Sequence, residues 1–363
     1  MDPWAGWNDL ARKKPFFRFA DTLAKGYAQV LFCLHPGTGL FLAGAIFYIS
    51  PAIGSLTLLG VVYSTLTAFL VRARALHIDS GVYGFNGVVL GVAWGWFFKL
   101  KPASVVLLIL AAILSSLLMK FLSGLSARTR TNVPVFSLPS LLLIWSLLLG
   151  LHTFFPRTDL LGPDQRMEEY FQDFQNHFLA LRNYFTGWMF FSTFQRHLVA
   201  IALILFGVYL HSWISAGAAG ISFLLTLAMI LGLGGIGEIV NIEFYLYNTI
   251  PCAIALGGIF LVLNRRAVAL TVLGVVLVGL LTFAGIKYFP FPAFVAPFNF
   301  ITILLIAGVK AGTFARKYGL HAVPMELIST PQMGIQWYQG ERYAVRFWQE
   351  ISNPSAKIIG RKG

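Results

Sequence analysis

Two asparagines in apolar surroundings are the first residues of this sequence whose chemistry is informative. Asn86 follows Phe85 and Asn248 follows Tyr247, each within a stretch that contains no acidic or basic residue. An asparagine amide offers donors and an acceptor for hydrogen bonds without a charge. Buried at such a position, the amide either caps the end of a nearby helix or contacts a neutral solute, and both interpretations stay open here.

A proline motif occurs once in each half of the chain. Residues 133–140 (VPVFSLPS) and 291–298 (FPAFVAPF) both read x-P-x-F-x-x-P-x, and both lead into an apolar run. Each motif follows one of the two aromatic–asparagine pairs, so the order is the same in both halves. This shared order indicates an internal repeat. Near the first pair, Gly81, Gly84 and Gly87 suit close approach of the backbone to a solute, or close packing of helices.

Patterns typical of enzymes and of ion-coupled carriers are missing from the sequence. No nucleophile–base pair, P-loop or metal-ligand spacing stands out, and the only cysteines, Cys33 and Cys252, lie in apolar stretches. The long apolar stretches also lack a central acidic or basic residue, which a carrier needs to hold a coupled ion. We therefore expect no catalysis, no cofactor and no metal, and we expect passive conduction of an uncharged solute.

The composition indicates which kind of structural element carries these residues. Hydrophobic residues make up 57% of the 363 residues and charged residues 11%, against roughly 25% in ordinary globular chains. This number of charges is too small to cover a water-exposed surface. The chain is therefore predicted to cross the membrane several times. The net charge of +13 is then attributed to loops that set orientation, and a nucleic-acid partner is not expected.

The apolar stretches predict five membrane segments, a polar interval and five more segments. Two of the stretches are long enough for two segments each, and Ser50-Pro51 and residues 212–220 supply the breaks. The stretches free of Asp, Glu, Lys and Arg are 26–71, 80–98, 102–119, 131–156, 197–237, 244–264, 267–286 and 288–309.

An odd number of segments in each half predicts that the second half enters the membrane from the opposite face. Arginines in the short loops place both termini in the cytoplasm, although Lys99 and Lys101 do not fit this charge rule. The expected regions are a cytoplasmic amphipathic N-terminus (1–25), a first repeat (26–156), an extracytoplasmic linker (157–186), a second, inverted repeat (187–312) and a cytoplasmic tail (313–363). Because aromatic and basic residues mix in the tail, we expect it to lie on the inner leaflet; binding of a partner is the alternative.

Several motifs resemble the urea transporter family. They are residues 63–68 (YSTLTA) and 81–91 (GVYGFNGVVLG), the paired proline motifs, and residues 26–30 (GYAQV) and 36–40 (PGTGL). The resemblance implies an all-α membrane protein with two inverted repeats of five transmembrane helices each plus re-entrant pore helices. It further implies a homotrimer in the bacterial inner membrane, with one pore per protomer and facilitated diffusion of urea.

The resemblance also assigns residues to the pore. Gln29 and Phe32 would lie near one slot for the solute, Phe85 and Val89 would line its wall, and Ser137 would stand at the midpoint. Several second-half positions depart from the family pattern, because Phe190 replaces a Glu or Gln, Tyr247 a Phe, Pro251 a Leu and Val295 a Thr. The full predicted set is Gln29, Phe32, Phe85, Asn86, Val89, Ser137, Phe190, Tyr247, Asn248, Pro251, Val295 and Phe298.

Two further functions are compatible with the same residues. A channel of this kind would also suit another small neutral solute, such as a short amide, ammonia or water. A non-conducting sensory relative is the alternative from a different class.

Overall fold

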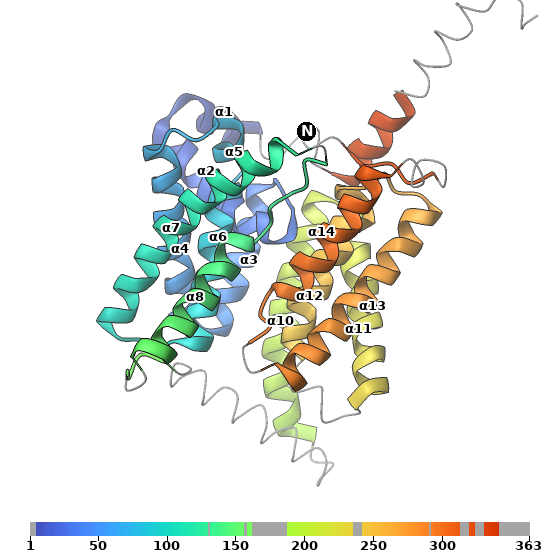
Figure 1. Ribbon diagram of the computed structural model, residues 1–363. Coiled ribbons are helices and arrows are strands. Elements are labelled where there is room, and N and C mark those ends of the chain that lie inside the picture. The colour runs from blue at the N-terminus through green and yellow to red at the C-terminus, as the bar shows by residue number, and fades with distance from the viewer. Residues whose placement is uncertain are drawn as a thin grey trace, which may run out of the picture.

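The computed structural model describes residues 5–129, 131–155, 158–161, 187–234, 242–289, 292–312, 319–323 and 330–340. Within these residues every extended regular element is a helix, and β-structure is limited to two isolated bridges. Figure 1 shows two groups of helices side by side, one coloured blue to green from the first half of the chain and one yellow to red from the second. The protein is therefore an all-helical membrane protein, as its composition predicts.

The first half contains eight α-helices and a short 3-10 turn. Proline stands in the first turn of α2, α3, α4, α7 and α8, where its missing N–H leaves no helical hydrogen bond unmade. The elements are α1 (Ala5–Lys13), α2 (Pro15–Ala28), η1 (Gln29–Leu31), α3 (Pro36–Ile49), α4 (Pro51–Leu70), α5 (Ala75–Asp79), α6 (Val82–Phe97), α7 (Pro102–Ala127) and α8 (Leu138–Phe154).

Among the described residues of the second half, five labelled α-helices and a π-helical turn precede a further helical segment. Asn264 caps α13, because its side chain accepts hydrogen bonds from the amides of Arg266 and Ala267. The elements are α10 (Gly187–His211), α11 (Trp213–Gly234), α12 (Ile242–Ile254), η3 (Ala255–Ile259), α13 (Arg265–Tyr288) and α14 (Ala296–Ala311), and residues 331–340 are also helical.

The apolar helices differ in length. Within the described residues, four are long and apolar enough to cross a membrane alone: Pro51–Leu70, Pro102–Ala127, Trp213–Leu233 and Arg265–Tyr288. Residues of α2, η1 and α3 make a fifth possible span, which is bent by 75° at its break. Five more apolar segments of the described chain are shorter: Val82–Phe97, Leu138–Phe154, Val199–His211 within α10, Phe244–Ile259 across α12 and η3, and Ala296–Ala311. These segments follow the order of the ten segments predicted from the sequence.

The N-terminal boundary differs in detail from the prediction at residue 25. Helix α2 begins at Pro15 and runs without interruption to Ala28, so charged residues lie within it. The helix accommodates them because Lys25 pairs with the buried Asp21 at 2.6 Å, one turn apart.

The glycine run of residues 81–87 serves helix packing. A Cβ atom on Gly87 would collide with the backbone of Gly60, and a Cβ on Gly60 with that of Gly87, so α4 and α6 touch backbone to backbone. A Cβ on Gly84 would press on the side chains of Thr65 and Val61 and on the backbone of Gly26, and Gly81 has a φ of 78°, which favours glycine. Of the two roles that the sequence left open for these glycines, the structure shows close packing.

Two matching β-bridges tie residues beyond the last helix of each half to the end of its third predicted membrane segment. Phe98, just after α6, pairs with Leu161, and Leu261, just after η3, pairs with Ala322. Residues 319–323, which belong to the predicted tail, therefore pair with the folded chain. Helical residues 331–340 also pack on it: Pro331 lies against Gly258, and Ser212 donates a hydrogen bond to Gln332. Tyr343, Phe347 and Trp348 lie outside the described residues.

Lys99 and Lys101, which do not fit the charge rule, have an acidic partner. Both ammonium groups contact the Asp159 carboxylate in the loop after α8, and all three side chains are more than two-fifths exposed. The hydrogen bonds and charges of Lys101 and Lys99 lower the pKa of Asp159 to about 2. Local neutralisation explains why two lysines are accepted in this loop.

Candidate functional site

The two asparagines hold the chain in the same way in both halves. The Asn86 amide on α6 donates to the carbonyl of Phe136 at 3.5 Å, and its oxygen accepts from the backbone N–H of Ser140 at 3.3 Å. The Asn248 amide on α12 donates to the carbonyl of Phe294 at 2.7 Å, and its oxygen accepts from the N–H of Phe298 at 3.1 Å. Each asparagine thus satisfies a free N–H in the first turn of α8 or α14. Both amides cap helices.

The turns that these asparagines hold have matching backbones. Phe136 has a φ of 50° and Phe294 a φ of 46°, a left-handed conformation that is uncommon for bulky residues. Ser137 follows the first and Val295 the second, with φ near −93° in both, and each is the residue that precedes its helix, α8 or α14. The internal repeat read from the proline motifs is therefore visible in local geometry.

Four phenylalanine rings from different parts of the chain meet near these turns. The centroids of Phe32 and Phe136 are 5.3 Å apart, and those of Phe136 and Phe298 are 5.1 Å apart. Phe260, after η3, contacts Phe32 at 5.6 Å and Phe136 at 5.2 Å. The structure thus brings together the predicted Phe32 and Phe298. It adds Phe260, which the sequence analysis missed because only the fold carries it to this place.

A second group of predicted residues lies in a neighbouring buried cluster. Phe85, Val89 and Val295 belong to it, and Tyr247 packs against it. The Tyr247 ring stacks on that of Phe294 with centroids 5.9 Å apart. Val30, next to Gln29 in the chain, packs against both this cluster and the one that contains Phe32. The two predicted groups are therefore adjacent.

Ser137 is bound to a residue that the sequence analysis missed. The Asn299 amide on α14 donates to the Ser137 hydroxyl at 2.9 Å and to the Val295 carbonyl at 2.7 Å. The Asn299 oxygen accepts from the Ser137 N–H at 3.2 Å. Both residues are buried, with at most 2% of their surface exposed. An asparagine directly after Phe298, in an apolar run, is the signal that could have found it.

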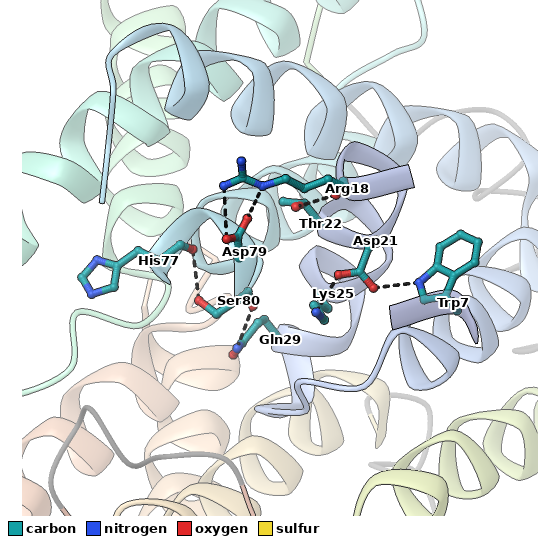
Figure 2. Close-up of polar contacts among 9 residues, drawn as sticks. All are labelled: Trp7, Arg18, Asp21, Thr22, Lys25, Gln29, His77, Asp79 and Ser80. Atoms are coloured by element: carbon teal, nitrogen blue, oxygen red, sulfur yellow. Dashed lines mark hydrogen bonds and ion pairs between the residues drawn. The ribbon is translucent and has the colours of Figure 1, made fainter. Parts of the chain in front are cut away.

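Gln29, the first residue of η1, directly follows α2, whose side chains make a series of polar contacts (Figure 2). Its amide donates to the carbonyl of Ser80 at 2.9 Å, which leaves its side-chain oxygen as an acceptor. Further up the helix, Asp21 accepts from the Trp7 indole at 2.8 Å and from Lys25. Arg18 holds Asp79 with two hydrogen bonds of 2.8 and 3.1 Å. These contacts fix α1 and α5 to α2 and so fix the position of Gln29.

Pro251 and Phe190 are the remaining predicted residues of the second half. Pro251 lies inside α12 and has no N–H, so the carbonyl of Tyr247 lacks its regular helical donor. Phe190 lies in α10, but its side chain is outside the described part of the chain.

This arrangement joins apolar rings to a few uncharged polar groups. Among the described residues, Asp21 is the only charged one in the buried set, and it is paired with Lys25. Such surroundings suit a small neutral molecule and are unfavourable for an ion.

Comparison with known proteins agrees with this chemistry. The family model described as urea transporter matches residues 20–313, which include all the predicted site residues. The chain belongs to the urea transporter family. It is 28% identical to urea transporter 1 of Rattus norvegicus over 43% of this chain and 41% of that relative. Urea transporter 1 of Ovis aries and of Mus musculus are both 27% identical, over 38% of this chain and 36% of each relative. The chain therefore spans less than half the length of these curated relatives in its matches to them.

Membership of the urea transporter family confirms the resemblance seen in the sequence motifs. The matched range begins within α2 and ends just after α14, so it takes in both proline motifs and both asparagines. The Ser137–Asn299 contact lies inside that range.

Proposed function

We propose that this protein is a passive channel for urea, with one pore per protomer. The observation that carries the proposal is the pair of matching turns, at Phe136-Ser137 and Phe294-Val295, which Asn299 joins and which lie in two adjacent buried and uncharged clusters. Membership of the urea transporter family supports urea as the solute. Urea is small, planar and neutral, so aromatic walls and a few polar groups can replace its water shell.

The pore in this proposal runs along the predicted residues. Gln29 and Phe32 form one slot, Phe85 with Val89 forms the adjoining wall, and Ser137 lies at the midpoint. Tyr247, Pro251, Val295 and Phe298 form the corresponding wall of the second half, and Phe190 stands where the family tends to have Glu or Gln. Asn86 and Asn248 act by holding the turns.

The two halves are proposed to form an inverted repeat, with re-entrant helices at its centre. The matching turns and β-bridges support the repeat. In Figure 1, α8 and α14 run in opposite directions, as inversion requires. The α-helix α1 and the helical residues 331–340 lie at the same end of the bundle in that view, which supports two termini on one side of the membrane. We place that side in the cytoplasm from the loop charges.

The repeats are proposed to span 26–156 and 187–312, joined by an extracytoplasmic linker at 157–186 and flanked by cytoplasmic termini at 1–25 and 313–363. Assembly as a homotrimer in a bacterial inner membrane completes the proposal. Its partners are thus urea, the lipid bilayer and two further copies of the chain.

Stopped-flow light scattering on proteoliposomes tests the function. The purified protein should give fast, saturable urea flux and slower flux of glycerol. Flux of acetamide, ammonia or water without urea flux would favour a channel for another neutral solute. This second function has one observation in its favour, because Val295 has no hydroxyl where the family has a threonine. Absence of flux for every solute would contradict both and favour a sensory role.

A further inference from the structure

The phenol of Tyr247 is a buried polar group for which the fold gives no partner. Its oxygen is inaccessible to solvent and makes no hydrogen bond to any described residue. Leaving such a hydroxyl unpaired costs about 1–3 kcal/mol, so a protein keeps one only for a reason. Phenylalanine would fill the same space without this cost.

The contacts of Tyr247 place its ring at the proposed pore wall. The ring stacks on Phe294, in the turn that leads to Val295, and packs against the cluster of Phe85 and Val89. Because Pro251 provides no N–H, the backbone carbonyl of Tyr247 also lacks its regular donor. Tyr247 thus has a hydroxyl without a described partner and a carbonyl without its regular helical donor, and its ring stacks on the turn that leads to Val295.

We propose that the Tyr247 hydroxyl binds the solute by donating a hydrogen bond to the carbonyl oxygen of urea. This inference rests on the proposed urea channel and assigns the polar group of its second half. A tyrosine hydroxyl is both donor and acceptor, and a solute carbonyl is the partner that its free proton requires. In the second half, the Tyr247 hydroxyl thus replaces the hydroxyl that valine lacks at position 295. In the first half, the Ser137 hydroxyl has this role.

The test compares Tyr247→Phe with Tyr245→Phe, which removes a buried tyrosine hydroxyl two residues away on α12. Urea and thiourea permeabilities are measured in proteoliposomes, together with the thermal unfolding temperature in detergent. Thiourea has nearly the shape of urea, but its sulfur is a weaker acceptor. Tyr247→Phe should lower urea permeability roughly three- to tenfold and thiourea permeability much less. Its unfolding temperature should equal or exceed that of the wild type, because an unpaired hydroxyl is removed.

The outcomes separate this inference from the proposed function. Wild-type flux of urea with unchanged flux in Tyr247→Phe would overturn the role of the hydroxyl and leave the channel standing. An equal loss of urea and thiourea flux in Tyr247→Phe would overturn it too, since the loss would then not depend on the solute carbonyl. A wild-type protein that conducts no urea would overturn the proposed function itself.

Discussion

At the scale of single residues, the contact between Ser137 and Asn299 joins the two halves through side chains. Asn299 uses both of its amide hydrogens and accepts the Ser137 N–H, so the serine hydroxyl keeps its proton and one lone pair for other partners. Nothing in the described residues takes up that proton. The Ser137 hydroxyl therefore belongs to the first half of the protein and is oriented by Asn299 of the second half.

Replacement of Asn299 by leucine tests this orientation. Leucine stands at the equivalent place in the first half, Leu141, so its size suits the fold. Asn299→Leu leaves the Ser137 N–H unpaired, and we expect a loss of about 1–3 kcal/mol in stability together with slower urea flux. Thr282→Val is the control, because that buried hydroxyl bonds only to its own helix at the Val278 carbonyl. Equal urea flux in the two variants would argue against a positioning role for Asn299.

The Ser137 hydroxyl at the proposed midpoint predicts that two substitutions change urea flux to different extents. Ser137→Val removes a group that is in place, whereas Val295→Thr adds one where the wild type functions without it. We therefore expect urea flux to fall several-fold in the first and to change little or increase in the second, by the value of one hydrogen bond. Stopped-flow measurements on both variants decide this. Equal rates would contradict the placement of Ser137 at the midpoint.

At the scale of elements, the packing of α4 on α6 depends on two glycines that face each other. We expect Gly87→Ala to destabilise the protein by about 1–3 kcal/mol, because the new methyl group would collide with the carbonyl of Gly60. Gly124→Ala on α7 is the matched control, since a Cβ there meets open space. Thermal unfolding of both variants in detergent measures the difference. Similar unfolding temperatures would show that α4 and α6 can separate without cost.

The ion pairs of Lys99 and Lys101 with Asp159 predict a pH dependence of the protein's stability. The pKa of Asp159 lies near 2 in the folded protein, below its ordinary value of 3.8. The contact therefore stabilises the protein above pH 3.8, and this stabilisation is lost as the pH falls toward 2. Any difference in unfolding temperature between the wild type and Asp159→Asn should be present at pH 6, shrink as the pH falls through the range from 3.8 to 2, and vanish below pH 2. Because the groups are exposed, we expect a small difference.

The helices could largely be predicted from the sequence, whereas the contacts at the site could not. Charged residues end most apolar runs, so runs such as 102–119 mark a helix directly. The proline motif likewise marked the turns before α8 and α14. The left-handed Phe32 and Phe136 and the partners of Asn299 were not predictable, because they depend on segments brought together from distant parts of the chain. Tyr247 was expected at the wall, but its unpaired hydroxyl is visible only in the packed structure.

At the scale of the whole molecule, the proposed orientation predicts where the termini lie. Reporter fusions at residue 1 and after residue 340 should both be active in the cytoplasm, and a fusion within 157–186 should be active outside. This follows from the odd number of segments in each proposed repeat. Termini on opposite sides would rule out the inverted arrangement.

The starts of α8 and α14 have a consequence for the cell that makes this protein. Both helices begin at the matched turns inside the protein and present the positive ends of their dipoles there. A conduit of this design should resist protons and ammonium ions even while neutral molecules pass. Vesicles that take up urea quickly should therefore hold an imposed voltage. A cell with the proposed channel in its membrane would then take up urea without losing its membrane potential.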